Sequence, residues 1–215
     1  MTTRAVLFDL DGTFADTASD LGEAANRLLR DQGHAPLPLE RFRPFSSAGA
    51  RGLLHVAFGL KPGDDEYPAM REAFLEAYAA RICVHTRIFP GIPELLEELK
   101  KRGIVWGIVT NKALRFTERL LAELKQEPAC VVCGDSTPHL KPHPAPMLLA
   151  LERLGLRGSD CVYLGDDLRD MQSARAAGVR SVAVEWGYHH PDQGGPGTWQ
   201  ADLVIRHPLD LLEHL

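Results

Sequence analysis

The hydrophobic positions of the chain alternate between short apolar runs and segments with helical spacing. Six runs are almost continuously apolar, which is typical of parallel strands covered on both faces. These runs are 5–8, 104–109, 129–133, 161–164, 181–184 and 203–205. Between them, apolar residues recur every three or four positions in 95–99, 114–124 and 147–154, the spacing of amphipathic helices. The pattern predicts an α/β core with a doubly wound, Rossmann-like parallel sheet.

One segment breaks this alternation, because 16–87 contains helical patterns but no convincing strand. The pattern Thr17-x-x-Asp20 is typical of a helix start, and Gly33 suits the end of that helix. Two more helices are predicted over 53–58 and 70–78. We therefore expect an all-helical cap domain over 16–87, inserted in a catalytic core made of 1–15 and 88–215. The breaker Pro90-Gly91-Ile92-Pro93 marks the second hinge.

Composition and charge exclude several classes of protein. The 215 residues include 24 Lys and Arg against 29 Asp and Glu, a net charge of −5, whereas a nucleic-acid binder needs a basic surface. No apolar run approaches the roughly 18 residues of a membrane span, and no signal-peptide pattern opens the chain. We expect a cytoplasmic monomer or homodimer that binds a small molecule, with no nucleic-acid or membrane partner. The polar segment 188–200 reads as a loop of unassigned role.

The four cysteines include a Cys130-Val131-Val132-Cys133 pattern, which raises a redox or zinc site as an alternative. Three of the four lie in strand-like apolar runs, where a thiol behaves as a small hydrophobic side chain. On a strand, positions i and i+3 point to opposite faces, which disfavours shared chelation. We therefore interpret these cysteines as core residues in a reducing compartment.

Polar side chains follow four of the predicted strands. Because ligands bind beyond the carboxyl ends of the strands in a doubly wound sheet, these side chains are expected to converge. They are Asp9, Asp11, Thr110, Asn111, Lys141, Asp166, Asp167 and Asp170. Each signal is weak alone, whereas their joint placement at one sheet edge indicates an active site.

The chemistry of such a cluster points to phosphoryl transfer. A turn at Gly12 would let Asp9 and Asp11 approach one point, and Asp166 would add a third carboxylate. Clustered carboxylates repel unless a cation lies among them, and an all-oxygen site that also meets phosphate suits Mg²⁺. Lys141 and the Thr110 hydroxyl could hold phosphate oxygens. One carboxylate could then attack phosphorus to form an aspartyl-phosphate, while the other protonates the leaving oxygen.

Each of these residues also has a purely structural interpretation. Asp11-Gly12-Thr13 could be an ordinary turn, Lys141 a solvated loop lysine, and Thr110 a helix N-cap. The acids near 166–170 could serve the first turn of a helix, where they favour the dipole. We prefer that interpretation for Asp167 alone. For Asp170 we expect a supporting role, orienting a metal-bound water or a neighbouring backbone group.

Four motifs resemble those of the haloacid dehalogenase-like hydrolase superfamily. They stand in the family's order and cover nearly the whole chain: Phe8-Asp9-Leu10-Asp11-Gly12-Thr13, Val109-Thr110-Asn111-Lys112, Lys141-Pro142-His143-Pro144 and Gly165-Asp166-Asp167-Leu168-Arg169-Asp170. The helical insert is similar to the cap of phosphoglycolate phosphatase-like members. N-acetylmuramic acid 6-phosphate phosphatases are similar as well.

This resemblance implies specific roles. Asp9 would be the nucleophile and Asp11 the general acid and base, with Mg²⁺ held by Asp9, the backbone carbonyl of Asp11, and Asp166. Thr110, Asn111 and Lys141 would hold the phosphate, and Lys141 also counts as catalytic. Phe14 replaces the leucine that usually ends the first motif, a conservative change. True dehalogenases lack the second aspartate, so Asp11 argues against that chemistry.

The resulting prediction is a Mg²⁺-dependent phosphate-monoester hydrolase acting on a small carboxylated metabolite. In the predicted cap, Gly49 would let the backbone approach the substrate, and Arg51 would bind its carboxylate. A sugar-phosphate phosphotransferase using Asp9 remains an alternative. A receiver-like domain with a phospho-accepting aspartate is a non-enzymatic alternative, disfavoured by the long insert. A nucleotide-binding fold without catalysis is disfavoured because no Gly-rich phosphate loop is present.

Overall fold

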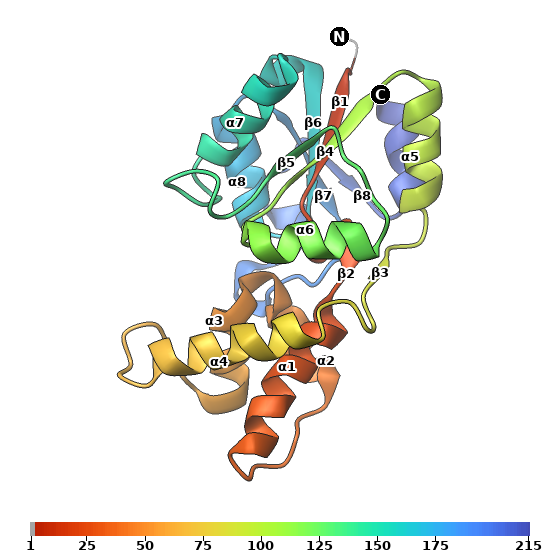
Figure 1. Ribbon diagram of the computed structural model, residues 1–215. Helices are drawn as coiled ribbons and strands as arrows, with labels where there is room; N and C mark the ends of the chain where they lie inside the picture. The colour runs from red at the N-terminus through yellow and green to blue at the C-terminus, as the bar shows by residue number, and fades with distance from the viewer. Residues whose placement is uncertain (1–2) are drawn as a thin grey trace.

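A computed structural model describes residues 3–215 and has a parallel α/β sheet with a separate group of helices at one edge (Figure 1). The six strands of the sheet run parallel in the order β5-β4-β1-β6-β7-β8. Their bounds are β1 Ala5–Phe8, β4 Val105–Val109, β5 Cys130–Val132, β6 Cys161–Gly165, β7 Arg180–Val184 and β8 Leu203–Ile205. Each of the six predicted apolar runs forms one of these strands, so the predicted fold class is confirmed.

Helices cover both faces of this sheet. They are α5 Ile92–Lys101, α6 Leu114–Glu123, α7 Ala145–Leu154 and α8 Leu168–Ala176. Alternate residues of β1 point to opposite faces: Val6 and Phe8 pack in the cluster that contains α5 and α6, whereas Ala5 and Leu7 pack with α7 and α8. Burial on both faces explains why the strands are continuously apolar in sequence.

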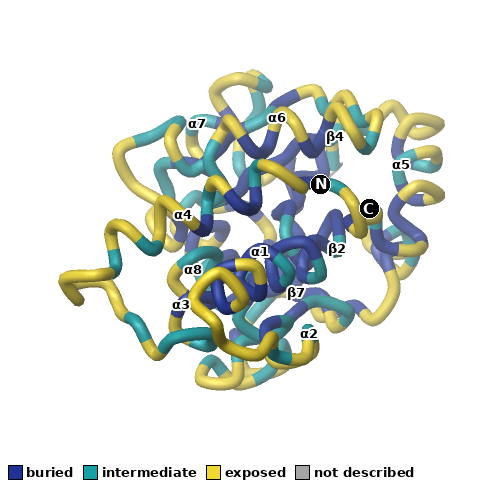
Figure 2. Tube along the Cα trace, turned by 60° about the horizontal axis from the view of Figure 1, so that its bottom comes forward, coloured by how far each residue is buried: buried dark blue, intermediate teal, exposed yellow. Residues whose placement is uncertain are grey.

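The second group of helices lies beyond the carboxyl ends of the strands (Figure 1). We call these four helices the cap helices: α1 Ala18–Asp31, α2 Leu39–Phe42, α3 Gly49–Phe58 and α4 Tyr67–Ala80. A 3₁₀ segment, Arg43–Ala48, joins α2 to α3. The sequence pattern did not predict α2 or this segment. The core of the group is buried, whereas the loop between α3 and α4 is exposed (Figure 2).

The insert has a short strand at each end, whereas the sequence pattern predicted no strand in 16–87. Here β2, Ala15–Asp16, pairs antiparallel with β3, Arg87–Ile88, so the two junctions between the insert and the core form one short ribbon. Two-residue strands carry no periodicity, which is why the sequence did not show them. Helix α1 begins where the Thr17 pattern predicted, but the Thr17 side chain makes no capping hydrogen bond.

The cysteines are free, and Cys130, Cys133 and Cys161 are buried in the sheet region. Burial raises the pKa of the Cys133 thiol to about 11, which disfavours thiolate chemistry. No helix within residues 3–215 is both long and apolar enough to cross a membrane.

Candidate active site

A cavity of about 500 Å³ lies between the carboxyl ends of the strands and the cap helices. Its wall includes most of the predicted site residues: Asp9, Asp11, Gly49, Arg51, Thr110, Asn111, Lys141, Asp167 and Asp170. The fold therefore brings together the ends of β1, β4 and β6 and residues 46–51, which we call the cap segment. The volume is in the range of small-ligand sites.

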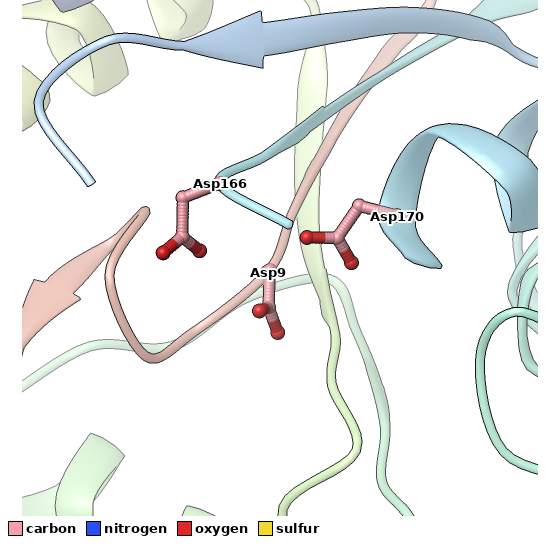
Figure 3. A group of neighbouring side chains, drawn as sticks. All are labelled: Asp9, Asp166 and Asp170. Atoms are coloured by element: carbon pink, nitrogen blue, oxygen red, sulfur yellow. The ribbon is translucent and has the colours of Figure 1, made fainter. Parts of the chain in front are cut away.

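Three carboxylates gather at the core end of this site (Figure 3). Asp9 follows β1, Asp166 follows β6, and Asp170 stands on the first turn of α8. One oxygen from each lies within 4.8 Å of the others, and all three residues are buried. Asp170 is thus a member of the cluster itself, whereas the sequence interpretation placed it behind the metal ligands.

Asp166 is fixed by donors from three separate segments. Its carboxylate accepts hydrogen bonds from Thr13 Oγ1, Ser47 Oγ and the Tyr188 backbone, each at 3.0 Å. A side chain at Gly12 or Gly187 would collide with this carboxylate, so two glycines let the backbone close around it. Burial, with the charges of Asp9 and Asp170 adding to it, raises the pKa of Asp166 well above its usual range.

Lys141 is the buried cation of the cluster. Its Nζ lies 3.0 Å from Asp9 Oδ1 and 2.7 Å from Asp170 Oδ1, and it also donates to Tyr163 Oη and the Val109 carbonyl. Burial alone would lower the pKa of Lys141, but Asp170 and Asp9 outweigh it and raise that pKa. The solvated-loop alternative is therefore wrong for Lys141.

Asn111 positions the Lys141 loop. Its side-chain nitrogen donates to the Lys141 carbonyl at 3.0 Å, and its side-chain oxygen accepts from the Lys141 backbone at 2.9 Å. Both polar groups are therefore engaged, so a phosphate contact from Asn111 would have to use its backbone. Thr110 is buried and lines the cavity, but α6 begins after Ala113, so the helix-cap alternative for Thr110 is wrong.

The Asp11 carboxylate points to a different set of partners. Lys112 Nζ lies 2.9 Å from Asp11 Oδ1, and Thr17 Oγ1 donates to the same oxygen at 2.6 Å. Lys112 also lies over the Tyr78 ring of α4, 4.6 Å from its centroid. Burial would lower the pKa of Lys112, but Asp11 raises it, so the lysine stays charged. The structure thus joins Asp11 to both the core and the cap helices.

Asp167 caps the start of α8, as its structural interpretation predicted. Its side chain accepts from the Arg169 backbone at 2.9 Å and pairs with the Arg169 guanidinium at 2.8 Å. The Asp167 backbone in turn donates to Asp170 Oδ2, which completes a capping box. Arg169 also donates to the Ser47 carbonyl at 3.0 Å, so this turn touches the cap segment.

The sequence analysis included Lys112 in the second motif without giving it a role, and it assigned no role to Ser47 or Tyr188. The Tyr188 hydroxyl accepts from the backbone amides of Thr17 and Ala18, at 2.6 and 3.0 Å, and so serves the start of α1. The sequence indicated no role for the loop 188–200. In the structure, Tyr188 of this loop connects Asp166 to the start of α1. For Lys112 the sequence signal was its place in the motif Val109-Thr110-Asn111-Lys112, and for Tyr188 it was the neighbouring Gly187 in the segment after β7.

The cluster fits a divalent metal ion. Asp9 Oδ1 is buried and receives no hydrogen bond within residues 3–215; the Lys141 ion pair is its polar contact. All candidate ligand atoms are oxygens, and Asp9, Asp166 and Asp170 form the one group of this kind found in the described part of the chain. Crowding of buried carboxylates is the electrostatic situation that a cation relieves.

Comparison with known proteins agrees with this geometry. Residues 6–184 match the haloacid dehalogenase-like hydrolase family, and the chain belongs to that family. An N-acetylmuramic acid 6-phosphate phosphatase of Pseudomonas putida is 40% identical over 213 residues, covering 98% of this chain and 95% of the relative. A phosphoglycolate phosphatase of Xanthomonas campestris pv. campestris is 42% identical over 216 residues, covering 98% and 95%.

Solved structures show the same architecture. A crystal structure titled a predicted phosphoglycolate phosphatase from Haemophilus somnus has a TM-score of 0.87 at 25% identity, covering 100% of this chain and 98% of that chain. CbbY from Rhodobacter sphaeroides, in complex with phosphate, has a TM-score of 0.77 at 25% identity, covering 98% and 96%. The predicted family and the prediction of a phosphatase are confirmed, and the two non-enzymatic alternatives are wrong.

Proposed function

We propose that this protein is a Mg²⁺-dependent phosphate-monoester hydrolase that acts through an aspartyl-phosphate on a small carboxylated phospho-metabolite. The observation that carries the proposal is the position of Asp9. It ends β1 at the floor of the cavity, beside Lys141 and two further buried carboxylates. The segment 16–87 would act as the cap domain, because its helices form the opposite wall.

Each residue at the floor of the cavity has a separate role in phosphoryl transfer. Asp9 attacks phosphorus, and the bond to the ester oxygen breaks. Lys141, held by Asp170 and by the Asn111 clamp on its backbone, offsets negative charge on the transferring group, and Thr110 binds one of its oxygens. When bound by Asp9, Asp166 and the Asp11 carbonyl, Mg²⁺ would neutralise charge on the phosphoryl oxygens.

Asp11 is proposed as the general acid and base. In the first half-reaction its proton passes to the leaving alkoxide, and in the second it takes a proton from the water that hydrolyses the aspartyl-phosphate. For this role the carboxylate exchanges its contacts with Lys112 and Thr17 for contacts with the leaving group. Because Thr17 lies at the start of α1, the acid is tied to the base of the cap helices.

Two substrates are favoured by the names of the relatives, N-acetylmuramic acid 6-phosphate and 2-phosphoglycolate. Both carry a carboxylate. The cavity volume of about 500 Å³ supports the larger one, because it lies in the range of sites that enclose a ligand of sugar-phosphate size. The free, buried cysteines support a reducing, cytoplasmic location, and a monomer or homodimer remains our prediction.

A turnover panel tests the proposal. Phosphate release is measured from both candidates, N-acetylglucosamine 6-phosphate, a hexose 6-phosphate and a nucleotide, with Mg²⁺ and after chelation. We expect turnover of a carboxylated substrate, dependent on Mg²⁺. Reaction in ¹⁸O-water separates the alternatives, because a hydrolase places the label in the released phosphate. A phosphotransferase would instead form an isomeric ester without label, and full activity after chelation would contradict the metal role.

A further inference from the structure

The charges on the cavity wall divide between its two sides. The acidic side chains of the wall all come from the core, and each pairs with a core cation within 4.0 Å. The pairs are Asp9–Lys141 at 3.0 Å, Asp170–Lys141 at 2.7 Å, Asp11–Lys112 at 2.9 Å and Asp167–Arg169 at 2.8 Å. The core cations are therefore already largely compensated by neighbouring carboxylates.

The cap side of the wall carries cations without such compensation. Arg51 of α3 and Arg71 of α4 both line the cavity. Neither has an acidic group within 4.0 Å in the part of the chain that the structure describes. On the core side, Arg115 of α6 pairs with Glu72 of α4 at 3.8 Å, and both of these side chains are exposed. The part of the cavity wall that comes from the cap helices thus carries two arginines and no acidic side chain.

We infer that Arg51 and Arg71 together bind a carboxylate on the leaving group of the substrate, and that Arg71 is a specificity-determining residue. This inference rests on the proposed function, since it takes the phosphoryl group to lie at Asp9. With that end fixed, the rest of the substrate extends toward the cap helices. There it meets two guanidinium groups from two different helices.

The chemistry of arginine suits this role. A guanidinium can donate two parallel hydrogen bonds to one carboxylate, and two such groups can hold it from both sides. Both side chains are exposed, so they are solvated at little cost until a substrate displaces the water. A neutral leaving group would gain nothing from them. The arrangement therefore selects for a charge on the far end of the substrate.

The test uses a pair of substrates that differ only in one lactyl ether group, which carries the carboxylate. N-acetylmuramic acid 6-phosphate carries a lactyl carboxylate, which N-acetylglucosamine 6-phosphate lacks. Arg71→Gln and Arg51→Gln are compared with wild type and with Arg41→Gln, an exposed cap arginine that does not line the cavity. We expect each cavity variant to lower kcat/KM on the carboxylated substrate by about 10- to 100-fold, mainly through KM. Activity on the neutral partner should stay within about twofold.

Several outcomes would overturn the inference. An equal loss on both substrates would show a general electrostatic or structural effect, and no loss on either would show that the arginines do not touch the substrate. Glucose 1,6-bisphosphate forms a third arm. A loss confined to this bisphosphate would assign the arginines to a second phosphate and not to a carboxylate.

Binding to the Asp9→Asn variant separates this inference from the proposed function. Calorimetric dissociation constants for the two amino-sugar phosphates are measured in that background, with and without Arg71→Gln. If wild type turns over no member of the substrate panel, 2-phosphoglycolate included, but the carboxylated amino sugar still binds more tightly in an Arg71-dependent way, the inference stands and the hydrolase proposal fails. If wild type turns over the substrates and Arg71 does not discriminate in binding, the reverse holds.

Discussion

Replacing Asp9 by asparagine should separate catalysis from stability. The two residues have nearly the same shape, but a neutral amide is a poor nucleophile toward phosphorus. If Asp9 forms the covalent intermediate, we expect kcat to fall by at least about 1,000-fold, as when other catalytic nucleophiles are removed. The fold should persist, because the substitution removes a charge and no packing volume.

The expected effect on stability follows from three distances. The Asp9–Lys141 pair at 3.0 Å contributes roughly 5 to 6 kcal/mol of attraction at an effective dielectric constant of 20. Asp166 and Asp170 have oxygens no farther than 4.8 Å from Asp9, and each would repel a charged Asp9 by at least about 3.5 kcal/mol on the same basis. The terms nearly cancel. With both neighbours charged, their repulsion at 4.8 Å exceeds the attraction by about 1.5 kcal/mol. With Asp166 protonated, which its raised pKa favours, the attraction exceeds the remaining repulsion by about 2 kcal/mol. The stability of the metal-free variant should therefore stay within about 2 kcal/mol of wild type.

The assay combines phosphate release with urea unfolding in the absence of metal. Asp192→Asn, at a side chain that is 90% exposed in the loop 188–200, is the matched control and should change neither quantity. Turnover within tenfold of wild type would refute the nucleophile assignment. A destabilisation above about 3 kcal/mol would show instead that Asp9 is held mainly as the partner of Lys141.

Four further changes probe other parts of the site. Asp11→Asn should slow an alkyl phosphate by about 100-fold but p-nitrophenyl phosphate much less, because a phenol leaves without a proton; equal rate losses would contradict the acid role. Mg²⁺ at 100 times its dissociation constant should stabilise the wild type by about 2.7 kcal/mol, roughly 5 to 11 °C in Tm. That shift should vanish in Asp166→Asn, and a preserved shift would place the metal elsewhere. Lys141→Met should cost about 3 to 5 kcal/mol in urea unfolding, because it leaves buried carboxylates without their cation; a cost under 1 kcal/mol would show that they are neutral. Tyr188→Phe removes the acceptor at the start of α1 and should cost about 1 to 3 kcal/mol, and an unchanged unfolding midpoint would show that water replaces the hydroxyl.

The strands and the aspartates of the candidate site were predictable because both follow local rules. A strand buried on two faces must be apolar throughout, so 5–8 and 161–164 were visible in the sequence. A polar residue directly after such a strand must lie at the carboxyl edge of the sheet, which places Asp9 and Asp166 without any knowledge of side-chain contacts. The same rule placed Thr110 and Asn111, although not what the Asn111 side chain binds.

The remaining contacts join residues that are far apart in sequence. Lys112 reaches Asp11 across 101 positions, and Tyr188 reaches the start of α1 across 171. Such pairs depend on how the cap helices sit on the sheet, which no local pattern encodes. The Thr17 hydroxyl illustrates this: a capping role was a reasonable local prediction, but the Asp11 carboxylate lies within reach and takes the hydrogen bond.

Asp166 shows how the carboxylate cluster and the cap side of the cavity are connected. One of its oxygens accepts from Ser47 in the cap segment and from Tyr188, whose hydroxyl serves the first helix of the cap. The other accepts from Thr13 in the turn after β1. A candidate metal ligand is therefore oriented by donors from both sides of the cavity, so a change in the position of the cap helices alters the metal site as well as the substrate pocket. For this reason substitutions in the cap segment should be read by comparing substrates, as in the Arg71 experiment, and not by loss of activity on one substrate alone.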